Sequence, residues 1–174
     1  MFSNKLVVAI FTAFVAFGFT ACVTRPNQVV YTPEQSESFG FNVDEGSNLS
    51  NPPENKARVY AIRRRGFNAW GLSFYMYYQY EPKLNAKNRL IVEKDIFQQN
   101  IAGYFSNGSH FYMDFNTDKP LLLIAGRESL SYIIFTPKAG KIYCIEGQPK
   151  TGWWAARFNI KFIDKTRCQK IWYR

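Results

Sequence analysis

Histidine and cysteine are scarce in this sequence, with one His and three Cys among 174 residues. A metal centre built on several histidines is therefore excluded, because a bound zinc ion takes about three or four protein ligands. The sequence also has no glycine-rich phosphate-binding loop and no nucleophile motif. Acidic residues number 13 against 22 basic ones, which gives a formal charge of +9. Aromatic residues are abundant instead, and the 16 Phe and 11 Tyr favour a protein built from β-strands.

Side chains that could carry catalysis occur singly. His110 is the one imidazole, and Asp114 and Glu128 are carboxylates without an evident partner. A catalytic triad needs a histidine beside a nucleophile and an acid, and a glycosidase needs two opposed carboxyl groups. The sequence therefore predicts no catalytic residue, no metal and no cofactor, and we expect the protein not to be an enzyme.

The first 21 residues are typical of an export signal. Lys5 precedes an apolar stretch of 14 residues from Leu6 to Phe19, and small residues follow before Cys22. A basic start, a short apolar core and a small-residue end make a secretory signal peptide. An uncleaved anchor is the alternative, but the apolar run is short for a membrane span, which needs roughly 20 residues.

The end of this signal resembles a bacterial lipobox. Phe19-Thr20-Ala21-Cys22 has its small residues and its cysteine, although Leu is commoner where Phe19 stands. The resemblance implies that Cys22 is acylated and becomes the mature N-terminus; the alternative is an ordinary signal peptide with an incidental cysteine. In diderm bacteria, Asp after the acylated cysteine retains a lipoprotein in the inner membrane. Val23 stands there, so the resemblance implies an outer-membrane anchor facing the periplasm.

Residues 22–55 have the composition of a flexible tether. They hold one base and five acids, together with four prolines and many Ser and Asn residues. Such a segment buries too little apolar surface to fold alone. We therefore predict a disordered acidic tether between the lipid and a domain.

Residues 56–174 show the period-two alternation of β-strands and hold 20 bases and 8 acids, a surplus of 12 positive charges. The pattern predicts an all-β domain, an antiparallel β-sandwich of about eight short strands of immunoglobulin or transthyretin type. The expected strands are 58–63, 72–80, 97–105, 110–115, 121–125, 131–136, 141–146 and 157–162. In 72–80, the residues that share one face are Leu72, Phe74, Met76, Tyr78 and Tyr80. Segments 90–94 and 166–174 fit a strand or a helix equally.

Two turns are expected to close hairpins. Asn107-Gly108 between aromatic-rich runs is the strongest short hairpin signal, and Ala139-Gly140 predicts a second hairpin.

Three short motifs resemble a family of small bacterial lipoproteins. They are Ala57-Arg58-Val59-Tyr60, Asn107-Gly108-Ser109-His110-Phe111-Tyr112-Met113-Asp114 and Ala139-Gly140-Lys141-Ile142-Tyr143. The family carries a domain of unknown function for which a β-sandwich is expected. The resemblance covers roughly residues 57–146 and concerns turns and strands, so it implies a fold and a compartment but no catalytic residue. Segments 82–95 and 148–156 are longer than the family's usual connections.

Two cysteines remain after Cys22. Cys144 and Cys168 form an even pair, and an exported protein meets an oxidising compartment. We predict a disulfide that joins the C-terminal segment to a core strand. The alternative is two separate thiols.

Basic residues gather in two runs. One is Arg63-Arg64-Arg65, and the other lies near the C-terminus and comprises Lys161, Lys165, Arg167, Lys170 and Arg174. Basic runs with interleaved aromatics favour nucleic acid in a cytoplasmic protein. For an exported protein, the anionic surfaces nearby are instead lipid head groups, lipopolysaccharide phosphates and peptidoglycan carboxylates. A merely solubilising face is the alternative.

Trp153 and Trp154 stand together in an expected loop. Neighbours on a regular strand point to opposite faces, so we expect one of the two to be an exposed contact. The alternative is a folded-back loop that buries both rings.

These features together predict an outer-membrane-anchored periplasmic lipoprotein that acts as a non-enzymatic binding or structural module through a basic and aromatic surface. The expected binding residues are Arg63, Arg64, Arg65, Trp153 and Trp154. The expected partners are the membrane, through the lipid, and an anionic envelope glycan or a protein, with no nucleic acid. Two alternatives stay open: a subunit of a larger envelope complex, and an enzyme that acts on envelope glycans.

Overall fold

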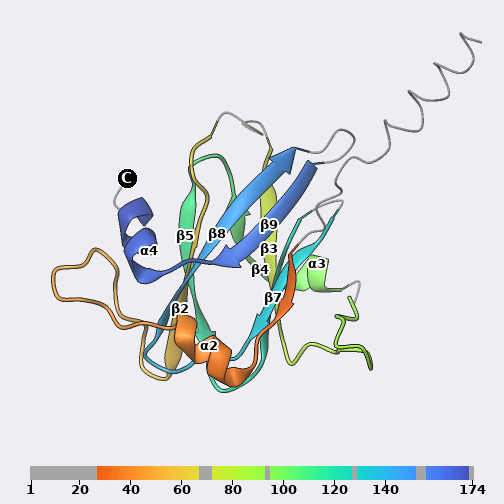
Figure 1. Ribbon diagram of the computed structural model, residues 1–174, viewed down its shortest axis with the longest axis horizontal. Coiled ribbons are helices and arrows are strands. Elements are labelled where there is room, and N and C mark those ends of the chain that lie inside the picture. The colour runs from red at the N-terminus through yellow and green to blue at the C-terminus, as the bar shows by residue number, and fades with distance from the viewer. Residues whose placement is uncertain (1–26, 67–71, 93–94, 127–128, 152–155, 173–174) are drawn as a thin grey trace, which may run out of the picture.

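The chain folds as an all-β sandwich, as the sequence predicts (Figure 1). The computed structural model describes residues 27–66, 72–92, 95–126, 129–151 and 156–172. Nine strands lie in these residues, in two sheets. The first sheet has the order β1 (Gln28–Val30), β7 (Ser131–Phe135), β6 (Leu121–Ala125), β3 (Phe74–Tyr80) and β4 (Ile101–Phe105). The second sheet has the order β5 (His110–Asn116), β2 (Lys56–Ile62), β8 (Ile142–Thr151) and β9 (Ala156–Phe162).

Both sheets are mixed rather than antiparallel. β1 pairs with β7 in parallel, and β2 pairs with β8 in parallel, while the other pairings are antiparallel. The sequence-based prediction of an antiparallel sandwich is therefore wrong at two pairings. Parallel neighbours need a long crossover, and in both cases the chain passes through the opposite sheet before it returns.

The two expected hairpins are turns that change sheets. Gly108 has φ +76° and Gly140 has φ +75°, so both adopt the left-handed conformation that the turn signals implied. However, the first turn joins β4 to β5 and the second joins β7 to β8. In each case the two joined strands belong to different sheets, so they do not pair. The turns are confirmed, and the hairpins are wrong.

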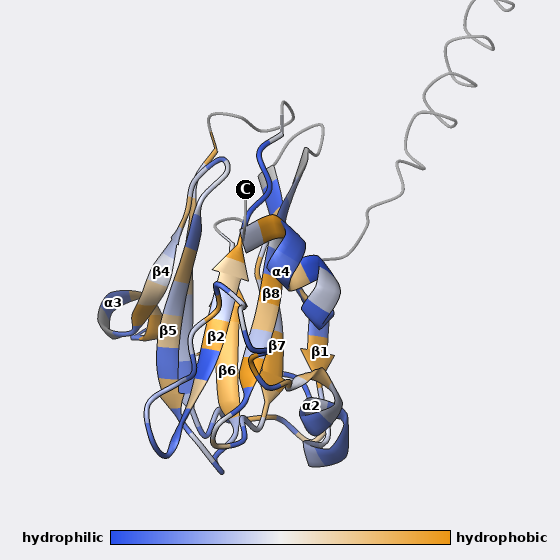
Figure 2. Cartoon of the chain, turned by 90° about the vertical axis from the view of Figure 1, so that its left-hand side faces the viewer, coloured by the Kyte–Doolittle hydropathy of each residue, from blue (hydrophilic) through white to orange (hydrophobic). Residues whose placement is uncertain are grey.

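Aromatic rings fill the space between the sheets. The inner face of β3 contributes Phe74 and Met76, as its alternation predicted, and Phe74 stacks on Phe158 of β9 with ring centroids 4.4 Å apart. Gly103 of β4 faces Phe111 of β5 so closely that a Cβ there would lie 2.1 Å from the ring. Figure 2 shows the apolar strand β6 in the middle of the sandwich.

The outer faces of both sheets are partly covered. Over the first sheet, α3 (Ile96–Gln99) and the preceding loop pack against β6 and β7, so all five residues of β6 are buried. Over the second sheet, α4 (Lys165–Trp172) packs with Cys168 and Ile171 against β2 and β8. The strand expected over 97–105 is thus divided between α3 and β4, and the open choice for 166–174 resolves as a helix through Trp172. Leu90 forms an isolated bridge with Leu84, and residues 91–92 are neither strand nor helix.

The predicted disordered tether over 22–55 is wrong for residues 27–55. β1 extends the first sheet, and α2 (Pro33–Phe39) begins with a capping box between Thr32 and Gln35. Phe39 stacks on Phe162 at 4.6 Å, and Leu49 is 3% exposed. These apolar residues are too sparse to show a period, and they are buried because they pack on the sandwich rather than on one another. Residues 22–26 lie outside the described part.

The acids of this segment also contact the domain. Asp44 accepts hydrogen bonds from Lys165, and from Gln169 at 3.2 Å, both on α4. The bond from Lys165 lowers the pKa of Asp44. The segment therefore holds the C-terminal helix as well as the first sheet.

Among the residues that the structure describes, none of the helices combines the length and the apolar character needed to cross a bilayer.

Candidate anion-binding cleft

A cleft of about 660 Å³ lies at the outer face of the second sheet, where β2 ends and β5 begins. Three segments form it: the end of β2 with the following loop, the turn before β5, and the end of α4. Its lining residues are Ile62, Arg63, Arg64, Arg65, Gly108, Ser109, His110, Lys170 and Ile171. None of these nine described residues is acidic.

The first two segments are tied together by main-chain contacts. Ile62 pairs with His110 in the sheet, the Arg63 N–H donates to the Ser109 carbonyl at 2.8 Å, and the Gly66 N–H donates to the Asn107 side chain at 3.0 Å. At Gly108, a Cβ would lie 3.4 Å from the Arg65 Cβ. The side chain of Arg65 therefore packs along the turn. Both of these cleft segments are attached directly to the ends of strands β2 and β5.

Arg63, an expected binding residue, is a structural cation instead. Its side chain is only 1% exposed, because it continues the inward-facing series of Val59 and Ala61 on β2. Its guanidinium donates to the carbonyl of Leu72 and, at 3.3 Å, to that of Phe105. Burial lowers the pKa of Arg63. Arg63 ends the expected strand 58–63, and its spacing of two from Ala61 is the signal that could have placed it on the inner face.

Arg64 and Arg65 are exposed as expected, and the fold brings Lys170 to them from α4. Arg64 is held by Glu146 of β8, a carboxylate that is 1% exposed. The Nε atom of Arg64 lies 3.1 Å from Glu146 Oε1.

Glu146 is the centre of a cluster of bases. Besides Arg64, it contacts Arg167 at 2.7 Å and Lys161 at 3.9 Å, and it accepts a hydrogen bond from Gln148 at 2.9 Å. A buried carboxylate is tolerated only when it is paired in this way. One acid against three bases leaves two positive charges in excess beside the cleft. Sequence reasoning missed Glu146; its signal was a lone acid in the apolar run of β8.

A row of rings borders the cleft on its His110 side. The His110 ring lies 4.4 Å from Trp172, which lies 4.5 Å from Tyr60. Tyr60 in turn lies 5.6 Å from Tyr112. His110 is thus a surface residue, as expected, and it packs against an aromatic row.

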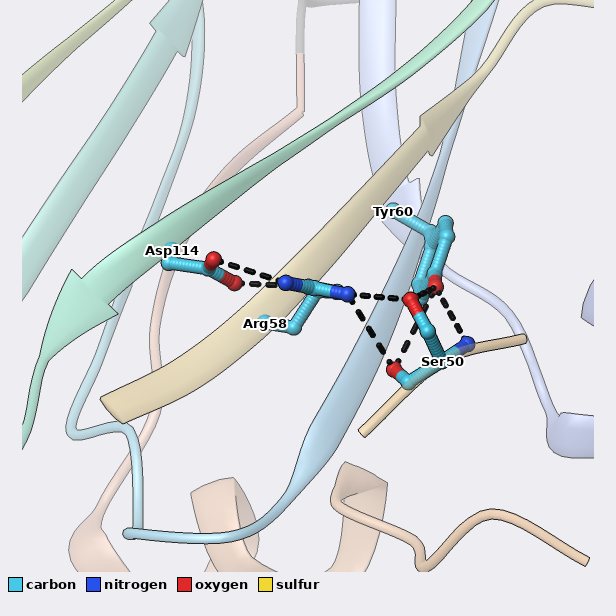
Figure 3. A network of polar contacts seen from close by, with 4 residues as sticks. All are labelled: Ser50, Arg58, Tyr60 and Asp114. Atoms are coloured by element: carbon cyan, nitrogen blue, oxygen red, sulfur yellow. Dashed lines mark hydrogen bonds and ion pairs between the residues drawn. The ribbon is translucent and has the colours of Figure 1, made fainter. Parts of the chain in front are cut away.

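Asp114 belongs to a structural network (Figure 3). Its carboxylate accepts hydrogen bonds from Arg58 Nε at 2.7 Å and Nη2 at 2.8 Å. The Nη1 atom of Arg58 contacts Ser50, whose N–H donates to the Tyr60 hydroxyl at 2.9 Å. The bond to Asp114 raises the pKa of Arg58. This network links Ser50 to β2 and β5. The Asp114 carboxylate is paired with Arg58 and therefore has a structural role.

The predicted disulfide between Cys144 and Cys168 is present. It joins β8 to α4 with the two Cα atoms 6.0 Å apart, and both residues are fully buried. Lys170 and Ile171 follow Cys168 within one turn of the helix, so the disulfide holds the third wall of the cleft in place.

Three expected site residues lie outside the described residues, namely Cys22, Trp153 and Trp154, and so does the carboxylate of Glu128. Of the segment 148–156, expected to be a long connection, the described residues 148–151 extend β8 and residue 156 begins β9, and these two strands pair up to Thr151 and Ala156. Within the described ranges, no group of three or more His, Cys, Asp or Glu side chains could hold a metal ion.

The chain matches no protein-family model, and comparison with curated proteins and with solved structures finds no significant match. Membership of the lipoprotein family therefore stays a prediction from three short motifs.

Proposed function

We propose that this protein is a lipid-anchored, non-enzymatic module of the cell envelope that binds an anionic envelope component in its basic cleft. The observation that carries the proposal is the cleft itself, which gathers Arg64, Arg65 and Lys170 and has no acid among its described lining residues. A concave surface of one charge concentrates ligands of the opposite charge. Arginine forks bind phosphate and carboxylate groups with two parallel hydrogen bonds.

The surroundings of the acids favour binding over catalysis. Asp114 is engaged by Arg58, and Glu146 is enclosed by bases. Neither is among the described lining residues of the cleft, whereas glycoside hydrolysis requires two opposed carboxyl groups. The proposal therefore assigns recognition, and no reaction, to this surface.

The proposed ligand is tested with the full chain, purified in a neutral detergent, against lipopolysaccharide and soluble peptidoglycan fragments across a salt series. Binding should weaken steeply as salt rises, because screening shortens the field to about 8 Å at physiological ionic strength. Replacing Arg64 and Arg65 by Ala should weaken binding at least about tenfold, because hydrogen bonds to charged groups are lost. Lys87→Ala with Arg89→Ala is the control, since these exposed bases lie in the loop on the other sheet. Equal binding by both variants would refute the cleft as the site.

The proposed anchor has its own test, and it rests on the lipobox-like residues before Cys22. Cys22→Ser should block acylation and leave the precursor without lipid, because the serine hydroxyl does not replace the thiol in that modification. Metabolic labelling with a fatty acid should mark the unchanged chain and not the variant. Label in both chains, or in neither, would contradict acylation at Cys22.

A partner-bound role in a larger envelope complex is the second candidate. The outer face of the first sheet exposes Tyr75, Tyr104 and Ile101 beside the edge strand β4, and the two tyrosine rings lie 4.9 Å apart. Exposed aromatic clusters of this kind are enriched at protein interfaces. Tyr75→Ser with Tyr104→Ser should abolish recovery of a co-purifying protein under this alternative and leave binding in the cleft unchanged.

A further inference from the structure

The reach of the lipid anchor limits where the basic cleft can act. Asn27 is fixed on the sandwich, because its N–H donates to the Asn159 side chain at 3.2 Å and its amide donates to the Ile160 carbonyl at 3.0 Å. Five residue steps separate Cys22 from Asn27. A fully extended chain covers at most about 3.6 Å per residue, so the lipidated cysteine lies within about 18 Å of the sandwich. A long tether would let the domain leave the membrane, whereas this short one keeps it at the bilayer surface.

The register of the second sheet puts the anchor point and the cleft at the same end of the sandwich. His110, Ile62, Glu146 and Lys161 form one row across β5, β2, β8 and β9. Gln148 of β8 pairs with Asn159, two residues beyond that row, and the parallel strand β2 leads in the same direction to Arg64. Two strand spacings separate β2 from β9, which corresponds to about 10 Å. Asn27, which is bonded to β9, therefore lies at about the same level along the strands as Arg64.

Positive charge dominates this end of the second sheet. Arg64, Arg65, Lys161, Arg167 and Lys170 face a single buried acid, Glu146. A base near an anionic bilayer strengthens attachment about fivefold, from an electrostatic gain of about 1 kcal/mol. A basic patch beside a lipid anchor adds an electrostatic attachment to the one that the lipid provides.

We propose that the basic cleft docks on the phosphate groups of anionic phospholipids in the membrane that carries the anchor, so that the sandwich rests on the bilayer by its β2-end rather than extending from it. This inference rests on the proposed function, whose ligand it narrows to the head groups of the membrane itself. Exposed Arg65 and Lys170 supply the contacts to the phosphates, and Glu146 holds the Arg64 side chain in the same cleft.

The test uses the lipid-anchored chain purified from membranes and reconstituted in two kinds of vesicle, one of phosphatidylcholine alone and one with a third of phosphatidylglycerol. Amide hydrogen exchange then reports which residues face the bilayer. Exchange in 62–66 and 108–110 should slow in the anionic vesicles only, and salt at high concentration should reverse the effect. The loop of residues 85–89 on the other sheet should exchange equally in both.

Two charge-matched variants separate docking from general attraction. Arg64→Ala, Arg65→Ala and Lys170→Ala together should shift the docking equilibrium on the order of 100-fold toward the free state, at about fivefold per base. Lys83→Ala, Lys87→Ala and Arg89→Ala together remove the same charge from the other sheet and should leave the protection intact.

Equal protection in neutral vesicles, or protection that survives loss of the three cleft bases, would overturn docking. If the cleft bases bind lipopolysaccharide in solution while the vesicles show no protection, docking is refuted and the proposed function stands. If the purified chain carries no acyl group and binds neither kind of vesicle, both the anchor and docking are refuted.

Discussion

A chain shortened to begin at Lys56 will fail to fold to the sandwich, although composition predicts that residues 22–55 are a disordered tether. The cut removes β1 from the first sheet and the side chains of Phe39 and Leu49 from their packing sites. Full burial of two such side chains is worth about 3–6 kcal/mol. That loss approaches the total stability of an ordinary domain, about 5–15 kcal/mol, before the lost strand is counted.

Polar groups left behind add to this loss. Arg58 loses its contacts to Ser50, and the Tyr60 hydroxyl loses the Ser50 N–H (Figure 3). Tyr132 loses the Asn27 carbonyl that its N–H binds. Buried donors and acceptors without partners cost about 1–3 kcal/mol each. Circular dichroism melting and amide spectra should therefore show a largely unfolded chain.

The matched control begins at Asn27 and keeps every described contact of the N-terminal segment. It should melt as cooperatively as the full chain. A chain from Lys56 with an unchanged melting temperature would show that residues 27–55 add nothing to stability.

Strand positions could be predicted from the sequence because alternation is a local signal. The expected strand 121–125 coincides with β6, and the inner face of β3 holds the expected Phe74 and Met76. Sheet membership could not be predicted in the same way. Asn107-Gly108 fixes a reversal of the chain, but the pairing of β5 with β2 rather than with β4 depends on residues distant in the sequence.

The N-terminal segment shows where composition misleads. Acids and prolines dominate its average composition. The residues that pack on the sandwich are a few apolar ones at irregular intervals: Tyr31, Phe39, Phe41 and Leu49. A regular period appears only when a segment forms one face against the core. These residues occupy separate places on two sheets, so no window of sequence could reveal them.

The candidate cleft was predictable in its chemistry and not in its assembly. Arg64 and Arg65 belong to the expected basic run, whereas Lys170 joins them only because α4 folds back over β2 and β8. The helix was ambiguous in the sequence, since its short apolar pattern fits a strand as well. The predicted disulfide was the one signal that tied this segment to the core.

Removal of that disulfide should weaken the fold and dismantle the cleft together. Closing a loop over a sequence separation of 24 residues stabilises a protein by about 3 kcal/mol in the chain-entropy model. Cys144→Ala with Cys168→Ala should therefore lower the free energy of unfolding by about this amount, with a small further loss for the two buried sulfur atoms. Chemical denaturation of the unchanged and variant chains measures it.

The consequence for the cleft follows from the position of Cys168 in α4. Besides the disulfide, the helix is held by Arg167 on Glu146, by Lys165 on Asp44 and by Trp172 against Tyr60. Of these, the pair of Lys165 with Asp44 is partly exposed and contributes little. Glu146 keeps Arg64 and Lys161 as partners if Arg167 leaves it. Loss of the covalent link should therefore free the end of the helix, raise amide exchange over 165–172 and withdraw Lys170 from Arg64 and Arg65. Binding in the cleft should then weaken to the level of a Lys170→Ala chain, which serves as the control with an intact disulfide. Full binding by the cysteine variant, with exchange in α4 unchanged, would show that the noncovalent contacts hold the helix by themselves.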